Sequence, residues 1–289
     1  MSQSAVRDSV DGSRAYRLTQ PSAHDGLGLG PDEFVRAVGE IAATDGSLGW
    51  LAGSYGIAAL ALAPAVADDV WGARPDAVVT VGQRGSALVA GGRLTGRWGS
   101  VVGAEHADWF LLSCEATYVL LPRRRVDVAV RALPTALPGA GIGDVTVTAV
   151  AVDDHDTAAA DPVVAAAAAA SVVVGSALGG WRRHVDQVRA RLAISYGGDE
   201  ITDEAAAQIA RSASDLDASR LQIATAGLAG GTAPYVQAIA RARGAADRLM
   251  ASSRHALDAS DPVTAAWRDV HAGCRLAAAV MRREGSRVR

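Results

Sequence analysis

The N-terminal part of the chain has the hydrophobic period of helices. Apolar residues recur at spacings of three and four over residues 34–42, after Pro31, which predicts a helix that begins at this proline. The polar run at 44–47 ends this helix and predicts a second one from Leu48 to about Leu62. A third, short helix is predicted over Pro64–Trp71.

After Pro75 the pattern changes to short apolar runs separated by Gly and Pro. The predicted strands cover residues 77–81, 86–90, 93–98, 109–113, 117–121, 126–130 and 144–152. Gly91 and Gly92 alone separate the second strand from the third, which is typical of a hairpin turn. Short strands at regular spacing predict a small antiparallel β barrel or sandwich.

From Thr157 onward the pattern is helical. Four long helices are predicted, to about Tyr196, from Thr202 to about Gly227, over about 233–255, and from Pro262 to about Arg283. Four long helices in series predict a bundle. The chain is therefore expected to be mostly α with a small β domain. Its divisions are an N-terminal helical region at 1–74, the β domain at 75–156 and a C-terminal four-helix bundle at 157–289.

The segment 163–181 carries no charged residue and is long enough to cross a bilayer. Most of its residues are Ala, Val, Gly and Ser, and Ala, Gly and Ser gain little from entering lipid. A helix that is apolar on every side is otherwise a core helix. The segment therefore predicts a fully buried helix in an oligomer core, and no membrane protein.

Composition narrows the class of protein. The 289 residues carry a net charge of −3, which argues against a nucleic-acid binder. The chain contains no lysine, so a Schiff-base mechanism is excluded. The two cysteines lie far apart and the six histidines are scattered, so neither a disulfide framework nor a metal site is expected. The first residues have no apolar signal core, which favours a cytoplasmic protein.

Three motifs occur in order along the chain. Asp-Gly-Ser-Leu-Gly-Trp spans 45–50, Gly-Arg-Trp at 96–98 is followed by Gly-Ala-Glu-His-Ala-Asp-Trp at 103–109, and Trp-Arg-Asp-Val-His-Ala spans 267–272. Together they resemble the acyl-CoA dehydrogenase superfamily, and within it most closely the group D flavin-dependent monooxygenases. The similarity covers about residues 25–285, so the N-terminal helical region is truncated relative to the family.

The resemblance implies a homotetramer and a flavin, FAD or FMN, bound between the β domain and the bundle. It implies that the loop 98–103, with Trp98, Ser100, Val102 and Gly103, contacts the flavin ring. It also implies that His271 lies over the ring as a proton donor or acceptor. From spacing alone, His271 is equally well explained as a residue that packs between helices.

Two positions depart from the family pattern. Val102 stands where relatives carry a polar residue, and Ser253 and Arg254 stand where relatives carry a glycine turn near the cofactor phosphates. Side chains at such a turn block a close approach of the backbone. We therefore expect flavin affinity to be weak or absent.

The resemblance implies a flavin-dependent oxidoreductase, chiefly a two-component monooxygenase that takes reduced flavin from a separate reductase. Its substrate would be a small aromatic or heteroaromatic molecule. Two alternatives stay open. One is a repurposed member without redox chemistry, either a non-catalytic partner of an active paralogue in a hetero-oligomer or an acid/base enzyme. The other is an acyl-CoA dehydrogenase, although the glutamate base of those enzymes has no match in this sequence.

Overall fold

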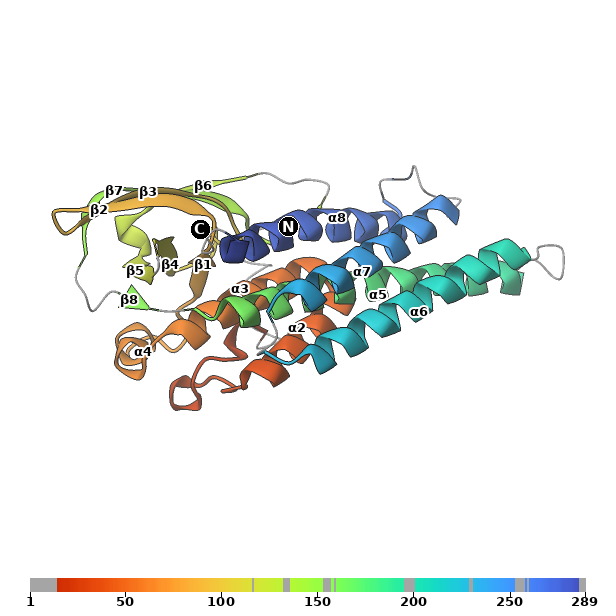
Figure 1. The fold of residues 1–289 in the computed structure, drawn as a ribbon, viewed down its shortest axis with the longest axis horizontal. Coiled ribbons are helices and arrows are strands. Elements are labelled where there is room, and N and C mark those ends of the chain that lie inside the picture. Colours follow the sequence, from red (N-terminus) through yellow and green to blue (C-terminus); the bar gives the residue numbers. More distant parts are fainter. Residues whose placement is uncertain are drawn as a thin grey trace.

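The chain folds into a β domain at one end of an elongated helical body (Figure 1). The computed structural model describes residues 15–115, 117–131, 136–152, 157–158, 160–194, 201–228, 231–252, 258 and 260–285. In Figure 1 the strands gather at the left, and the long helices run from them towards the right. The predicted order of helices, strands and helices is confirmed.

The helices begin and end close to the predicted positions. They are α2 (Pro31–Thr44), α3 (Gly46–Ala61), α4 (Pro64–Trp71), α5 (Pro162–Ile194), α6 (Asp203–Ala226), α7 (Ala233–Ser252) and α8 (Pro262–Gly285). Side-chain caps set two of the starts, because Asp45 accepts from the Leu48 amide and Thr202 accepts from the Ala205 amide. Such caps satisfy amides that have no partner inside the first helical turn.

The strands form two four-stranded sheets that pack against each other. They are β1 (Val79–Gly82), β2 (Gly85–Ala90), β3 (Arg93–Val101), β4 (Trp109–Cys114), β5 (Thr117–Pro122), β6 (Asp127–Val130), β7 (Gly143–Ala151) and β8 (Thr157–Ala158). One sheet has the order β1-β4-β5-β8 and the other β2-β3-β7-β6. A separate apolar core, which includes Leu94, Trp98 and Phe110, fills the space between them.

Two details of the β domain differ from the sequence prediction. The pair β1–β4 is parallel, not antiparallel, with Val79 opposite Trp109. Between these strands the chain makes the β2–β3 hairpin in the other sheet, and it returns beside β1 in the same direction. The second difference is β8, which pairs with β5 at Thr157 and Ala158, where the helical region was expected to begin. The sequence indicates helix starts at both Asp156-Thr157 and Asp161-Pro162, and α5 begins at the second of them.

Helix α5 is the central helix of the body. By length and composition it could cross a membrane, with a mean hydropathy of 1.9 over its most apolar window, but 89% of that window is buried inside the protein. Gly175 permits its close packing on α2, because a Cβ there would lie 2.1 Å from the Gly39 carbonyl oxygen. The predicted burial is confirmed, and the neighbouring helices of the same chain provide it.

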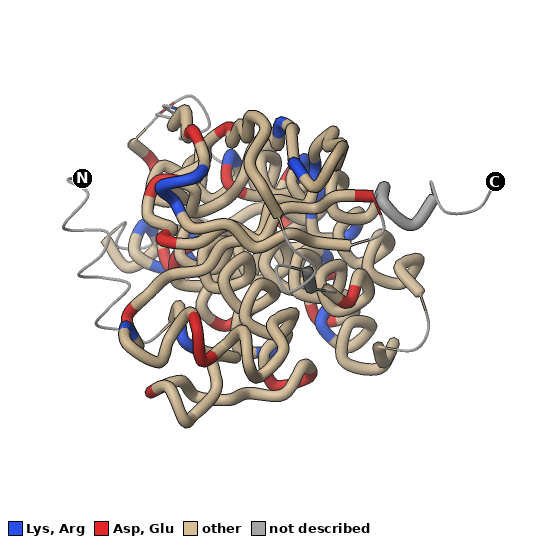
Figure 2. Tube along the Cα trace, turned by 90° about the vertical axis from the view of Figure 1, so that its left-hand side faces the viewer, with Lys and Arg blue, Asp and Glu red and all other residues tan. Residues whose placement is uncertain are grey.

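Charged residues are dispersed at the β-domain end. Figure 2 looks at this end and shows basic and acidic positions interspersed along the trace. Exposed arginines pair with acids in several places, as Arg131 does with Asp144 and Arg74 with Asp108. The described residues also include a continuous basic run, Arg123–Arg125, which forms a short 3-10 helix between β5 and β6.

Candidate functional site

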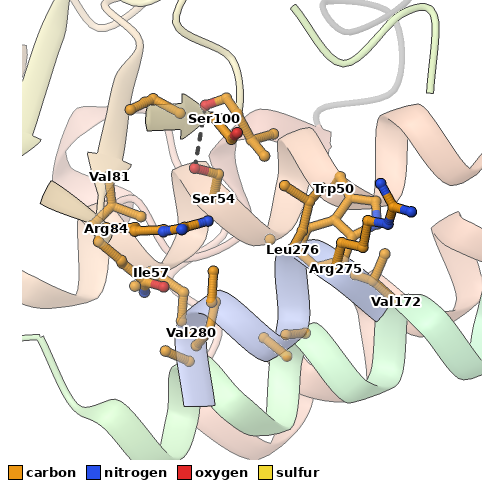
Figure 3. A pocket seen from close by; sticks show the side chains of 18 of the residues that line it. Trp50, Ser54, Ile57, Val81, Arg84, Ser100, Val172, Arg275, Leu276 and Val280 are labelled. Carbon is orange, nitrogen blue, oxygen red and sulfur yellow. Dashed lines mark hydrogen bonds between the residues drawn. The ribbon is translucent and has the colours of Figure 1, made fainter. Parts of the chain in front are cut away.

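A cavity of about 220 Å³ lies where the β domain meets the helical body (Figure 3). Helices α3, α5 and α8 contribute to its wall, together with β1, the turn after β1 and the end of β3. The residues that line it are Trp50, Gly53, Ser54, Ile57, Val81, Gln83, Arg84, Gly99, Ser100, Val101, Val102, Ala165, Ala168, Ala169, Val172, Arg275, Leu276, Ala279 and Val280. Its volume is somewhat below the common range for ligand pockets, about 300–1,000 Å³.

The helical wall of the cavity is apolar and built largely from small side chains. Ala165, Ala168, Ala169 and Val172 recur at spacings of three and four, so one face of α5 presents them all to the cavity. Alanine side chains leave the surface of a helix smooth, which suits contact with a flat ring. Trp50 adds a large aromatic surface from α3.

A short hydrogen-bond network supports the polar side of the cavity. Thr80, which is fully buried, donates from Oγ1 to the Val102 carbonyl oxygen at 2.5 Å. The Ser54 and Thr80 hydroxyl oxygens are 2.9 Å apart. Because the single Thr80 hydrogen goes to Val102, the Ser54 hydroxyl donates its own hydrogen either to Thr80 or to the Val102 carbonyl oxygen, which lies 3.4 Å away. Ser54 therefore offers lone pairs to the cavity and can accept from an O–H or N–H group of a ligand.

The loop after β3 is shaped by a bulge. The register of β3 against β7 shifts between Trp98 and Val101, and Ser100 has a φ of 56°. Asp144 on β7 holds this conformation by accepting from the Ser100 amide at 3.0 Å. Burial acts to raise the pKa of Asp144, but hydrogen bonds from Arg131 and Ser100 outweigh it and hold the pKa below its usual value. The carboxylate stays charged, and the loop stays bent towards the cavity.

The lining residues include no His, Cys, Tyr, Asp or Glu among the parts of the chain that the structure describes. Arginine does not release a proton near neutral pH. The described residues of the cavity can therefore bind and orient a ligand and exclude water. They include no side chain that could act as a general acid or base.

The comparisons with known proteins agree with this geometry. No family model matches the sequence. The oxygenase subunit HsaA of a flavin-dependent monooxygenase from Rhodococcus jostii is 26% identical, over 89% of this chain and 83% of its own. Among solved structures, the HsaA monooxygenase from M. tuberculosis superposes with a TM-score of 0.82 at 22% identity, covering 100% of this chain and 92% of that one.

The chain is similar in sequence to flavin-dependent monooxygenases and has their fold. The predicted resemblance and the acyl-CoA dehydrogenase-like fold are thereby confirmed. A further neighbour of this fold is TdsC from Paenibacillus sp. A11-2, solved with FMN and indole. It superposes with a TM-score of 0.73 at 17% identity, over 98% of this chain and 90% of that one.

The structure brings two of the four predicted loop residues to the cavity. Ser100 and Val102 line it. Trp98 does not, because its side chain points between the two sheets, where Nε1 donates to the Ser113 carbonyl oxygen at 2.9 Å. Gly103 lies behind the wall, with a φ of 73° and the Tyr55 ring against it. Ser253 and Arg254, predicted near the cofactor phosphates, lie outside the described residues.

His271 lies outside the cavity, on the side of α8 that packs against α7. Its Nε2 is 2.7 Å from Asp247 Oδ1, and its ring lies 4.5 Å from the Trp267 ring, centroid to centroid. Asp247 also accepts from Trp267 Nε1. Burial acts to raise the pKa of Asp247, but the hydrogen bonds with His271 and Trp267 outweigh it and hold the pKa below its usual value. This arrangement joins two helices.

We expect His271→Ala to lower the free energy of unfolding by about 1–2 kcal/mol, because it removes the hydrogen bond from α8 to Asp247 on α7 and the ring contact with Trp267 within α8. Activity per folded molecule should change little. Thermal unfolding combined with turnover measured at matched folded concentration checks both parts. A loss of turnover of about 100-fold at unchanged stability would instead restore the predicted catalytic role of His271.

Sequence reasoning missed four residues that the cavity exposes to a ligand: Trp50, Ser54, Arg84 and Arg275. Two signals in the sequence were available. Trp50 ends the first of the three motifs, and Ser54 follows it by one helical turn. Arg275 follows His271 by one turn in the last helix, but it faces the cavity whereas His271 faces α7.

Proposed function

We propose that this protein is the oxygenase component of a two-component flavin-dependent monooxygenase that acts on a small aromatic substrate. The observation that carries the proposal is the cavity itself. The loop to which the resemblance assigns the flavin contact forms one wall of the cavity, and an alanine-faced helix forms another. The similarity to the HsaA oxygenase subunit over most of both chains supports it.

The residues present fit a flat ring system. The smooth face of α5, the indole of Trp50 and the side chain of Val102 form apolar surfaces, and Ser54 can accept one hydrogen bond. Reduced flavin supplies the electrons for oxygen activation in such sites. The chain's own residues exclude water, orient the substrate and hold the loop 99–102 in place through Thr80 and Asp144.

Flavin binding tests the proposal. Because Val102 adds no polar contact, we expect FMN or FAD to bind in reduced form with a Kd of about 1 μM or weaker, about −8 kcal/mol. Anaerobic titration of both flavins, oxidised and reduced, measures this. Turnover with an added flavin reductase would then identify aromatic compounds that are hydroxylated. Binding well below 1 μM would contradict the weak affinity and leave the monooxygenase proposal standing.

A second candidate, a non-catalytic partner of an active paralogue, is favoured by one observation. The described cavity supplies no side chain for proton transfer. If neither flavin binds in either redox state, the partner role replaces the monooxygenase role. The same observation counts against an acid/base enzyme without flavin.

We further propose a homotetramer in the cytoplasm. Since α5 is buried within its own chain, its apolar character no longer requires a partner. The support comes instead from apolar side chains exposed on the bundle, among them Leu221 at 65% and Val236 at 48% exposure. Light scattering at micromolar concentration should give a tetramer, and a monomer would contradict this part of the proposal.

A further inference from the structure

Two arginines line the cavity, and the sequence analysis assigned no function to either of them. Arg84 lies in the turn after β1, and Arg275 lies on α8. Figure 3 shows Arg84 reaching into the cavity on the side of Ser54, and Arg275 beside Trp50 and Leu276. Both are exposed residues that also line the cavity, so they stand at its mouth.

No acidic residue balances these two charges at the cavity. The lining includes no Asp or Glu among the described residues, and within those residues neither guanidinium group is joined to a carboxylate. Elsewhere in the molecule exposed arginines do pair with acids, such as Arg131 with Asp144 and Arg74 with Asp108. Two uncompensated guanidinium groups beside an apolar cavity attract an anion.

The position of the charges indicates which part of such a ligand is apolar and which part is charged. The interior of the cavity is apolar, with Ala168, Ala169 and Val172 on one wall. A carboxylate carried into that interior would lose its hydration at high cost. At the mouth it can keep water and still bind a guanidinium group. The ligand that fits both zones has an apolar ring and an acidic group at its edge.

The backbone at the cavity offers a flavin phosphate no additional donors. Arginine binds phosphates as well as carboxylates, and many phosphate sites add the free amides of a helix N-terminus. At the cavity, the first turn of α5 is already capped, because Asp161 accepts from the amides of Val163 and Val164. Helix α8 presents residues 275–280 to the cavity, which lie towards its C-terminal end.

We propose that Arg84 binds the carboxylate of an aromatic acid whose ring occupies the cavity, and that Arg275, on another side of the mouth, adds to the positive potential that attracts it. This inference rests on the proposed function, because it names the substrate class of the same site. It adds a preference for acidic over neutral ligands, which the fold alone does not imply. An aromatic acid binds, and a neutral ligand of the same size binds less well.

A matched pair of ligands tests the proposal without turnover. Indole-3-acetate and indole-3-acetamide serve as probes, since they have nearly equal size and differ in charge. Calorimetric titration of the full chain should show the acid binding about tenfold more tightly than the amide. Arg84→Gln and Arg275→Gln should each reduce this preference and leave amide binding nearly unchanged. Arg124→Gln, an exposed arginine in the β domain away from the cavity lining, is the matched control and should keep the preference.

Two further measurements distinguish a carboxylate of the substrate from a phosphate of the flavin as the bound anion. FMN and riboflavin differ by the phosphate, and the arginine variants should not change the ratio of their affinities. Raising NaCl from about 0.05 M to about 0.5 M should weaken acid binding in the unmodified protein and spare the amide. This salt arm needs no variant, so a folding defect cannot obscure it.

Several results would overturn the proposal. Equal affinity for acid and amide, or no binding of either, would remove the anion site. If both arginine variants keep the preference for the acid over the amide, the anion site lies elsewhere. A loss of the preference for FMN over riboflavin in the arginine variants, while they keep the preference for the acid over the amide, would assign the arginines to the flavin phosphate. Failure of both flavins to bind would refute only the proposed monooxygenase, because the acid-against-amide comparison does not depend on flavin.

Discussion

Replacement of Trp98 by alanine is expected to lower the free energy of unfolding by about 3–5 kcal/mol. Trp98 is 1% exposed and fills the space between the two sheets. Truncation would leave a large cavity and would leave the Ser113 carbonyl oxygen without the indole donor. Chemical or thermal unfolding followed by circular dichroism measures the loss.

Trp98→Phe is the control that separates a core role from a cofactor role. It keeps an aromatic ring in the core and removes the N–H donor, so we expect a cost of about 1–2 kcal/mol. Flavin affinity should stay unchanged in this variant, because the side chain does not line the cavity. A variant with normal stability and flavin binding weakened tenfold or more would show that Trp98 contacts the cofactor after all.

Replacement of Gly103 by alanine is expected to cost about 2–4 kcal/mol, from two causes that add. Its φ of 73° is unfavourable for any residue with a Cβ, at about 1–2 kcal/mol. An added Cβ would lie 2.5 Å from the Tyr55 ring, which is 3% exposed and cannot move without displacing the core. Because Gly103 follows Val102 directly, the cavity wall should shift as well.

Gly91 offers a matched control in the β2–β3 hairpin. Its φ is 57°, and a Cβ there would meet nothing within 4 Å. Gly91→Ala should therefore cost only the backbone contribution, about 1–2 kcal/mol. The difference between the two variants in unfolding free energy measures the contact with Tyr55. Equal costs at both positions would show that this contact contributes nothing.

Most elements could be predicted from local pattern. The starts of α2, α4 and α8 follow from a proline at the first helical position, which is a strictly local signal. The strand β8 was missed, because two residues cannot show a period. It exists only by pairing Thr157 with Val119 and Ala158 with Tyr118 on β5. The parallel pairing of β1 with β4 was missed for the same reason, since pairing partners lie far apart in the chain.

The site was predicted less well than the fold. The loop 98–103 was placed at the site. In a regular strand Trp98, Ser100 and Val102 would share one face, because side chains point to opposite faces from one residue to the next. Trp98 enters the core between the sheets, and Ser100 and Val102 reach the cavity because a bulge bends the strand after Trp98. In the last helix, His271 and Arg275 are one turn apart and lie on nearly the same face. Their positions along the helix decide which of them reaches the cavity, because α7 packs beside the turn of His271 and the cavity lies beside the turn of Arg275.

The sequence by itself determined the class of this protein: a helical region, a small β domain, a buried central helix and a bundle, in the order of the flavin-dependent monooxygenases. Local periods, turn residues and caps carry that information. Only the tertiary structure decided which side chains meet at the cavity. Trp50, Ser54, Arg84 and Arg275 come from three separate segments of the chain. These residues are close together because of packing between distant parts of the chain. A short stretch of sequence cannot predict such packing.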